Sequence, residues 1–347
     1  MAGAGRAGVG LGFQTDKQTS DYERLAAGAE HYGFDVVSAF ADLYFQPPLP
    51  ALLAMARATS RIRLGPACLN PYLLHPVEIA GQVAALDQAS GGRAFLGLAR
   101  GAWLGDLGVN QRDAPQAVAE AAAVVAALMA GDRRGVEGSR FSLPPGAGLR
   151  QSPLRPVVPL LVGTWGPRLA AVAGAIADEL KIGGSANPEM VPVMRRWAGT
   201  GAGAGPAARR RQSPVAIVVG AVTVVDPDRA AARARARRQV AMYLDVVGRL
   251  DPTVEMPPGL LQDLGSALRQ SGPEAAAALV PDEVLDRFAF AGAPGEVAAH
   301  AVEILRAGAD RVDFGSPHGL DEDRGLELLG SQVLPAIREE MGTAAPA

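Results

Sequence analysis

The stretch PLLVGTWGPRLAAVAGAIADELKI, Pro159–Ile182, decides the fold. A short apolar run leads into a glycine-rich turn, then an alanine-rich segment, then a second short apolar run. Such runs are typical of strands covered by helices on both faces, and a strand–helix–strand unit places its strands in parallel. The stretch therefore predicts strands at Pro159–Val162 and Asp178–Ile182, with a helix at Pro167–Gly174 between them.

The same alternation of strands and helices continues along the chain. Further strands are predicted at Val9–Phe13, Phe34–Ala39, Ile62–Ala67, Ala94–Leu98, Val215–Val225 and Arg311–Phe314. Further helices are predicted at Asp21–Tyr32, Leu49–Ala58, Val77–Ala89, Ala114–Ala130 and Pro294–Ala307. Eight strands in this order predict an α/β fold, a (β/α)8 TIM barrel.

The length predicts a single barrel domain over residues 1–347. A barrel of this kind typically needs about 250 residues, so the remaining residues form insertions. We expect the insertions near residues 135–156, 186–213 and 243–286. The second of them contains a low-complexity loop rich in glycine, alanine and arginine.

The composition argues against several classes of protein. Hydrophobic residues make up 48% of the chain and charged residues 20%, which is ordinary for a globular protein. A net charge of -3 without a basic stripe argues against a nucleic-acid partner. No apolar run approaches the roughly 20 residues of a membrane span, and Met1–Gly8 does not resemble a secretory signal, so we expect a cytoplasmic protein. One cysteine and four scattered histidines predict no metal site.

The functional residues of a TIM barrel lie at the carboxyl ends of its strands. The turn after the fifth predicted strand reads Gly163-Thr164-Trp165-Gly166-Pro167. Its backbone N–H groups and the dipole of the following helix predict a phosphate site. Lys181, near the end of the neighbouring strand, could add a positive charge there, or could form an ion pair with Asp178 or Glu179.

The ends of the third and fourth strands offer further candidate cofactor contacts. Ala67, Cys68 and Asn70 leave room for a flat ring over the mouth of the barrel. Cys68 could be a nucleophile, but no histidine partner is identifiable, which favours a buried packing residue. After the fourth strand, Ala99 is followed by Arg100, which could hold an anionic group or pair with Asp42.

Three residues are candidate catalytic residues. Asp42 is the only carboxylate in the window after the second strand, and Tyr44 beside it could donate a proton. His318 lies at the end of the eighth predicted strand, where it could reach a ligand. A fourth polar residue, His75, is predicted to cap the helix that begins beside Pro76.

Four stretches, in the same order along the chain, resemble one known family: Ile62–Pro76, Leu86–Gly97, Pro159–Asp178 and Phe290–Gly319. They resemble the bacterial luciferase-like superfamily, and within it the methylenetetrahydromethanopterin-reductase-like proteins. The resemblance implies a barrel that binds the deazaflavin coenzyme F420 or FMN, with the ring against the third strand and a non-proline cis peptide bond at Ala67–Cys68. It also implies a phosphate site at the turn after the fifth strand, with Lys181 as an additional phosphate or carboxylate ligand.

The chain departs from the family pattern at two places. Several F420-dependent members carry an Asp-His pair after the second strand, where this chain reads Ala41-Asp42-Leu43. The glutamate of F420-dependent sugar-phosphate dehydrogenases after the fourth strand is replaced around Ala102-Trp103. These departures argue against oxidation of a sugar phosphate. Hydride transfer in which the cofactor carries the reactivity remains possible, with Tyr44, His318 or water as the proton donor.

The resemblance thus predicts an F420-dependent oxidoreductase that transfers a hydride between the cofactor and a small metabolite, with reduction of a C=N or C=C bond. The first alternative is an FMN-dependent two-component monooxygenase that uses oxygen. The second is a non-catalytic flavin-binding barrel. A partner flavin or F420 reductase would supply reduced cofactor. A homo-oligomer is expected, because the alanine-rich helix Ala114–Ala130 could pack against another subunit.

Overall fold

Eight parallel strands form a nearly closed barrel in the computed structural model, which describes residues 7–201 and 214–342. The (β/α)8 prediction is confirmed. Neighbouring strands follow the order β3-β2-β1-β9-β7-β6-β5-β4, and isolated bridges Leu64–Ala94 and Leu69–Leu98 link the two ends of this order. The barrel strands are β1 (Gly8–Phe13), β2 (Val36–Ala39), β3 (Arg63–Pro66), β4 (Leu96–Ala99), β5 (Leu160–Gly163), β6 (Glu179–Gly183), β7 (Ala216–Val225) and β9 (Arg311–Gly319).

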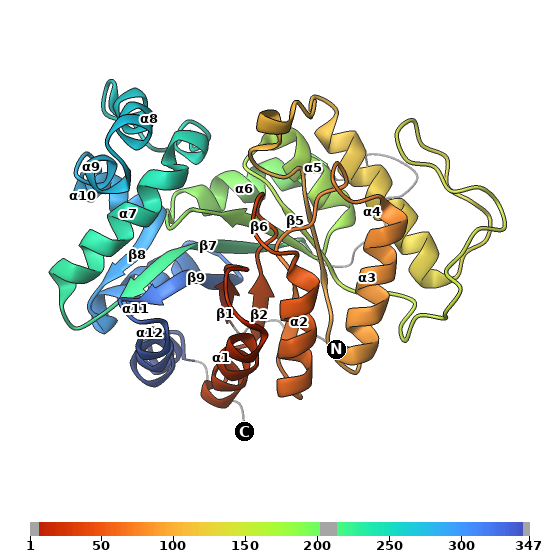
Figure 1. Cartoon of the computed structure of the whole chain (residues 1–347), viewed down its shortest axis with the longest axis horizontal. Helices are drawn as coiled ribbons and strands as arrows, with labels where there is room; N and C mark the ends of the chain where they lie inside the picture. Colours follow the sequence, from red (N-terminus) through yellow and green to blue (C-terminus); the bar gives the residue numbers. More distant parts are fainter. Residues whose placement is uncertain (1–6, 202–213, 343–347) are drawn as a thin grey trace.

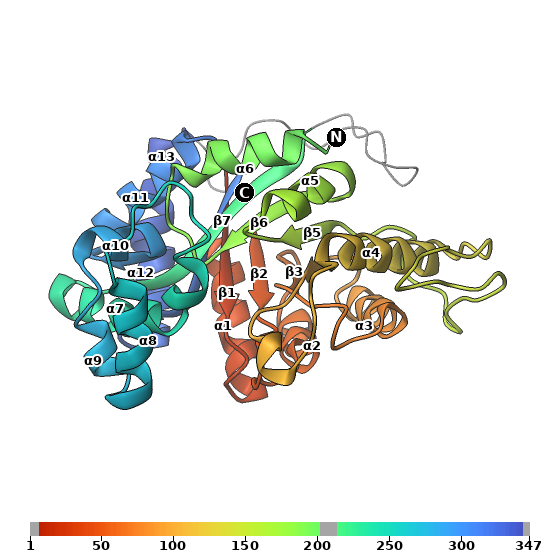
Figure 2. The same ribbon diagram turned by 90° about the horizontal axis from the view of Figure 1, so that it is seen from above.

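Helices surround the barrel on its outer side (Figures 1 and 2). Each predicted helix is present, with ends within two residues of the predicted bounds. Four of these helices are absent from the predicted set: α6 and α7, which follow β6 and β7, and α12 and α13, which follow β9. The surrounding helices are α1 (Thr19–Tyr32), α2 (Pro48–Ala58), α3 (Pro76–Ala89), α4 (Ala114–Ala130), α5 (Pro167–Ile176), α6 (Met190–Gly199), α7 (Arg229–Val247), α11 (Pro294–Arg306), α12 (Glu322–Leu328) and α13 (Leu334–Glu340).

One strand, β8 (Ala289–Gly292), is absent from the predicted set. It pairs in parallel with β7 at Val222–Val225 and, among the described residues, with no other strand. The lower part of β7 pairs with β6 instead, so β7 continues past the end of β6 to reach β8, while its other edge stays paired with β9. A strand of four residues whose partner is half of another strand leaves little local signal in the sequence.

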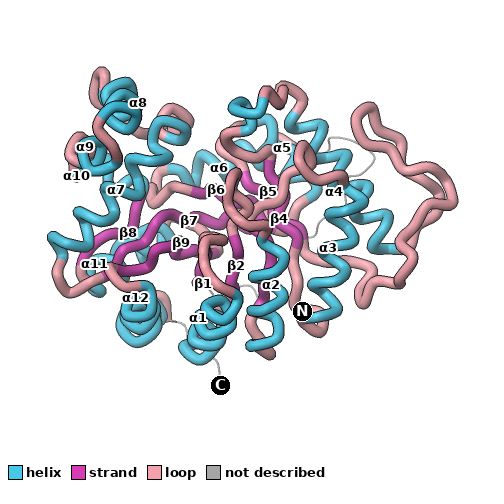
Figure 3. Tube along the Cα trace, viewed as in Figure 1, coloured by secondary structure: helices cyan, strands magenta, loops and turns pink. Residues whose placement is uncertain are grey.

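The three segments predicted as insertions differ in structure. Residues 131–158, here called the α4–β5 loop, project from the barrel with one bridge, Val136–Leu143 (Figure 3). Helix α6 occupies part of the second segment as the regular helix after β6, and residues 202–213 lie outside the described residues. The third segment holds three helices that pack beside α7 around a second apolar cluster (Figure 1): α8 (Leu260–Gln270), α9 (Pro273–Ala277) and α10 (Asp282–Phe288).

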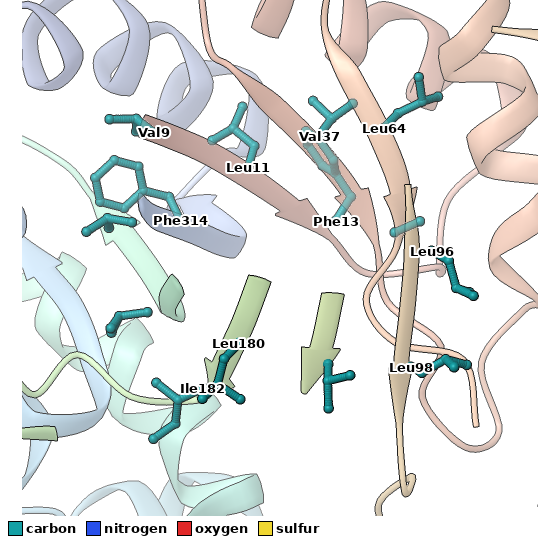
Figure 4. Packing of buried hydrophobic residues seen from close by; sticks show 14 of the residues in the cluster. Val9, Leu11, Phe13, Val37, Leu64, Leu96, Leu98, Leu180, Ile182 and Phe314 are labelled. Atoms are coloured by element: carbon teal, nitrogen blue, oxygen red, sulfur yellow. The ribbon is translucent and has the colours of Figure 1, made fainter. Parts of the chain in front are cut away.

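Side chains alternate between the two faces of the barrel strands. Outward-facing apolar residues such as Leu11, Leu64 and Ile182 pack beneath the helices (Figure 4). Most inward-facing residues of β2 to β5 are apolar or glycine, with Ser38 and Arg63 as exceptions, whereas β6 and β9 turn charged side chains into the interior. The interior therefore combines an apolar half with an ionic half.

Candidate active site

The turn at residues 163–167 connects β5 to α5 at the carboxyl end of the barrel. The Gly166 N–H donates to Thr164 Oγ1 over 2.9 Å, which shapes the turn and leaves the Thr164 hydroxyl free to donate. Pro167 begins α5, and no side chain caps the helix. The N–H groups of its first turn are therefore available to an anion, with the exposed Arg168 beside them. The sequence analysis did not single out Arg168.

Trp165 faces away from this anion site. Its Nε1 donates to the carbonyl of Gly183 over 2.7 Å, and its ring stacks on Phe288 with centroids 6.4 Å apart. Gly183 ends β6 and Phe288 ends α10. Trp165 thus ties the α5 turn to the helical insertion.

The peptide bond Ala67–Cys68 is cis, as the family resemblance implies. The Cys68 thiol lies close to two glycines on neighbouring strands, since a Cβ at Gly163 would be 3.0 Å from Sγ and one at Gly97 would be 3.2 Å away. Burial raises the pKa of this thiol to about 12. A protonated thiol in contact with two strands is a packing residue, which agrees with the favoured interpretation of Cys68.

Asn70 and the end of β4 complete this rim. Asn70 is buried, and its Oδ1 accepts from the N–H groups of Tyr72 and Leu73 at 3.2 and 3.0 Å, so it shapes the turn after β3. Ala99 is half-buried at the end of β4. Arg100 is exposed, and no ion pair between described residues joins it to Asp42.

Asp42 lies after β2 and is held by a residue that the sequence analysis did not identify. Gln14 follows β1 and donates from Nε2 to Asp42 Oδ2 over 2.8 Å. Burial raises the pKa of Asp42, and the Gln14 hydrogen bond opposes this shift only in part. Tyr44 is 78% exposed and has a φ of 69°, a left-handed backbone conformation that is unusual for a bulky residue.

His318 does not face the mouth of the barrel. It is fully buried, with Nδ1 3.3 Å from Glu322 Oε1 and Nε2 3.2 Å from the Phe314 carbonyl. The ring also meets Phe13 edge-on at 5.0 Å. Both nitrogens are occupied inside the protein, so the expectation that His318 reaches a ligand is not supported. A left-handed backbone at His318 turns the side chain inward, which the sequence pattern does not reveal.

Lys181 also lies elsewhere than expected. Its Cα is in register with Gly163, but its Nζ points into the barrel and binds Asp313 Oδ2 at 2.6 Å. The ammonium is thus neither at the α5 turn nor paired with Asp178 or Glu179. Alternation along β6 explains this, because Leu180 and Ile182 face the helices and Lys181 must face inward.

Comparisons with known proteins identify the family. The model of the family described as luciferase-like monooxygenase matches residues 5–311. The chain belongs to the luciferase-like monooxygenase family. This membership confirms the family resemblance and the prediction of an enzyme.

Two relatives and one solved structure cover nearly all of this luciferase-like chain. The 5,10-methylenetetrahydromethanopterin reductase of Archaeoglobus fulgidus is 28% identical over 340 residues, which are 95% of this chain and 99% of the relative. The F420-dependent glucose-6-phosphate dehydrogenase of Beutenbergia cavernae is 28% identical, with 89% and 91% covered. The structure of the coenzyme F420 dependent tetrahydromethanopterin reductase from Methanopyrus kandleri superimposes with a TM-score of 0.82 at 24% identity over 96% of this chain and 99% of that one, which shows the fold.

The luciferase-like barrel carries an interior ion chain that the sequence analysis did not predict. Glu179 Oε1 accepts from Arg311 Nη1 at 2.7 Å and from Arg63 Nη1 at 3.1 Å. Arg311 Nε then donates to Asp313 Oδ1 at 2.8 Å, and Asp313 in turn binds Lys181. These five residues are here called the interior ion chain. Its sequence signal is the alternation Glu-Leu-Lys-Ile in β6 and Arg-Val-Asp-Phe in β9.

Other features bear on the remaining predictions. His75 caps α3 as predicted, since its Nδ1 accepts from the Val77 N–H at 3.3 Å. Within residues 7–201 and 214–342, no group of three His, Cys, Asp or Glu side chains is placed to hold a metal ion. No helix in the described part of the chain is both long and apolar enough to span a membrane.

Proposed function

We propose that this protein is an F420-dependent oxidoreductase that transfers a hydride between the deazaflavin and a small metabolite, with reduction of a C=N or C=C bond. The observation that carries the proposal is the coincidence, at one end of the barrel, of an uncapped α5 turn and the small side chains of Ala67, Cys68 and Ala99. A cofactor with a flat ring and a phosphate needs both an anion site and a narrow space for the ring. The candidate space for the ring, formed by Ala67, Cys68 and Ala99, is here called the ring seat. The relatives named for F420 favour the deazaflavin.

The residues at the α5 turn fit a phosphate. The Thr164 hydroxyl, the first-turn N–H groups of α5 and the Arg168 guanidinium all lie at the start of this helix. A Cβ added at Gly166 would meet only Thr164 Oγ1, at 3.9 Å, so the backbone there is open to a close ligand. We assign Gly163 to the ring side of the turn, where it faces Cys68.

The residues around the cis bond fit a ring. Ala67 and Cys68 present small side chains, Ala99 lies on the neighbouring strand, and Asn70 fixes the turn behind them. Gly97 and Gly163 carry no side chain, which lets the turn that holds Cys68 lie close against β4 and β5. Exposed Arg100 is placed at the same rim, where it would contact an anionic part of the cofactor or substrate.

When bound, the deazaflavin supplies a hydride-carrying ring carbon, and the chain supplies position and a proton. Asp42 is the first candidate for a catalytic polar group, because it lies in the loop after β2 and Gln14 fixes its carboxyl group. Tyr44 is the second candidate, since its exposed side chain lies on the same loop. His318 is withdrawn from this role, because its ring is enclosed in the protein.

The alternative is an FMN-dependent monooxygenase fed with reduced flavin by a partner reductase. The description of the family as a monooxygenase favours it, and so does a fold neighbour from Pseudomonas putida, the oxygenating constituent of 3,6-diketocamphane monooxygenase in complex with FMN, with a TM-score of 0.68. A reductase partner and a homo-oligomer stay predictions. A barrel that binds flavin without catalysis would bind either cofactor and turn over no substrate.

The test is an anaerobic calorimetric titration with F420H2 and, separately, with FMNH2. We expect tight binding of F420H2 by the wild-type protein and at least about tenfold weaker binding by Gly166→Val, with the unfolding midpoint unchanged because the position is open. Gly81→Val is the matched control, because an added side chain at Gly81 on α3 meets no atom within 4 Å.

Each other outcome has a distinct meaning. Undiminished binding in Gly166→Val would contradict the phosphate site at the α5 turn. A wild-type preference for FMNH2 would favour the monooxygenase, and oxygen consumption with reduced FMN would then be measured. Binding of F420H2 without oxidation by any imine or enone would weigh against the proposed reaction.

A further inference from the structure

The interior ion chain runs along the barrel from its amino end toward the candidate cofactor site. Arg63 begins β3 at the amino end, and its side chain is 40% exposed. Glu179 and Arg311 lie above it as the first residues of β6 and β9. Asp313 and Lys181, each two residues further along its strand, form the upper end. Only the lower end of the chain therefore meets solvent.

The chain has more positive than negative charge. Three cations face two carboxylates, and the side chains of Arg311, Asp313 and Lys181 are at most 9% exposed. Asp313 is shared, because Arg311 Nε lies 2.8 Å from one of its oxygens while Lys181 Nζ lies 2.6 Å from the other. One carboxylate divided between two cations leaves the charge of Lys181 only partly compensated.

The Lys181 ammonium has unused hydrogen-bonding capacity. It carries three N–H donors, and among the described residues it has one hydrogen-bond partner, Asp313. Gly220 on β7 lets the Lys181 side chain pass close to the strand, since a Cβ there would lie 3.3 Å from Lys181 Cε. Further acceptors for this ammonium can therefore come from a ligand that approaches from above.

The ammonium lies near the candidate ring seat. The Cα of Lys181 is paired in register with Gly163, the residue whose Cβ position is 3.0 Å from Cys68 Sγ. Lys181 on β6 and Cys68 in the turn after β3 thus lie on either side of Gly163 and face the same part of the interior. Against the effect of burial, the positive charge of Lys181 lowers the pKa of the Cys68 thiol, which places it within electrostatic reach.

We propose that Lys181 contacts the cofactor ring from inside the barrel and stabilises the reduced ring. This inference rests on the proposed function and replaces the expected role of Lys181 as a phosphate ligand. Acceptance of a hydride adds two electrons and one proton to the ring, so the ring gains one negative charge unless a second proton follows. A fixed, incompletely compensated cation binds that charge more strongly than it binds the oxidised ring.

The test compares Lys181→Met with Arg63→Met. Both substitutions remove one cation from the interior ion chain, but Arg63 is at the far end. Anaerobic fluorescence titrations give the dissociation constants of oxidised F420 and of F420H2 for each variant. We expect Lys181→Met to reduce the preference for F420H2 by about tenfold, which corresponds to about 30 mV in the reduction potential of the bound two-electron couple. We expect Arg63→Met to change this preference by less than about twofold.

Two results would overturn the inference. Equal weakening of both redox forms by Lys181→Met would indicate a ligand of the phosphate or of another unchanging group. An unchanged preference would place the ammonium away from the ring. If Lys181→Met does not fold, Lys181→Met combined with Asp313→Asn removes the cation without leaving an unpaired buried carboxylate, and the same shift is expected.

Failure of the proposed function gives a different result. Wild-type protein that binds FMN instead of F420 would overturn the choice of cofactor. The preference between oxidised and reduced FMN would then be measured with the same variants, and the same loss is expected in Lys181→Met. Wild-type protein that binds neither cofactor overturns both proposals.

Discussion

On the side of β2 to β5, the barrel interior is filled mainly by Val36, Phe95 and Leu161, with Cys68 packed on them, whereas on the side of β6 and β9 it is filled by the interior ion chain, which Arg63 of β3 joins at the amino end. The apolar half needs no partners beyond close packing. The ionic half needs a counter-charge for every group and space for long side chains. The difference shows that one barrel can bury charge where its neighbouring strands make room for it.

Glycines on the adjoining strands provide that room. A Cβ at Gly10 would collide with Asp313 Oδ1, and one at Gly220 would lie 3.0 Å from the Asp313 carbonyl. In the apolar half, Gly97 and Gly163 instead make room for Cys68. The two halves thus meet beneath the candidate cofactor site, one offering an apolar surface and the other a charge.

The largest expected effect comes from breaking the ionic half at its centre. Glu179→Gln keeps the shape of the side chain but removes the charge that faces both Arg311 and Arg63. An uncompensated buried cation should lower the free energy of unfolding by about 3–5 kcal/mol. Glu340→Gln is the control, since its partner Arg306 and Glu340 itself are about 60% exposed, and it should cost less than about 1 kcal/mol. Equal small losses in urea denaturation would show that water screens the ionic half.

Acid should reduce the stability that the interior ion chain contributes to the folded protein. It should not change the stability that packing in the apolar half contributes. Burial favours a protonated Asp313, but Arg311 and Lys181 outweigh it and hold the pKa of Asp313 at about 2. A depressed pKa stabilises the folded state above the unfolded value of 3.8, and this contribution is lost as pH falls toward 2. A shift of this size is worth about 2–3 kcal/mol.

The control for this acid effect lies in the apolar half. Leu161→Ala creates a cavity there without touching an ionisable partner, so we expect a stability loss of about 2 kcal/mol or more that is the same at every pH. Urea denaturation of the wild-type protein and of Leu161→Ala is measured between pH 7 and pH 3. The change of the free energy of unfolding with pH is then compared between the two proteins. A pH slope in the wild-type protein that begins well above pH 5 would assign acid sensitivity to other groups.

A substitution on β1 tests the space around the Asp313 carboxylate without changing any charge. Gly10→Ala places a methyl group against the Asp313 carboxylate and should cost about 1–3 kcal/mol through overpacking. Gly81→Ala on α3, in open space, should be neutral or stabilising by up to about 1 kcal/mol. Thermal unfolding of the two variants is the measurement. An unchanged Gly10→Ala midpoint would mean that Asp313 has freedom to move.

The smallest effect concerns Asp42 at the mouth. Burial raises the pKa of Asp42, so its ionised form costs stability at pH values above its folded pKa, and that cost is absent below the unfolded value of 3.8. Asp42→Asn should therefore gain about 0.5–1 kcal/mol at pH 7 while it lowers turnover. Asp245→Asn, on the exposed side of α7, should change neither. A loss of stability at pH 7 in Asp42→Asn would indicate that the carboxylate is favoured in its ionised form.

The sequence predicts most of the fold because the signals are local. Continuous apolar runs mark the buried parallel strands, and helix α4 has the predicted bounds, Ala114–Ala130. Helix α6 is missed because it adjoins the low-complexity segment, and β8 because its pairing depends on the extension of β7 past the end of β6. Long-range pairing of this kind leaves no periodicity in a short segment.

The candidate site is predicted less completely. The α5 turn and the cis bond follow from residue types and from the family resemblance. The inward orientation of Lys181 could have been derived from the alternation along β6, since Leu180 and Ile182 are plainly apolar. The burial of His318 could not, because it depends on a left-handed backbone and on Glu322 in the following helix.

One edge of β7 pairs first with β6 and then with β8, and this arrangement has an evolutionary consequence. The insertion from α8 to α10 ends directly at β8, and β8 pairs with the part of β7 that extends past the end of β6. A descendant of this gene could lengthen, shorten or exchange the insertion without altering the register of any barrel strand. Selection could thus vary the helices beside the mouth while the phosphate turn, the cis bond and the interior charges are inherited unchanged.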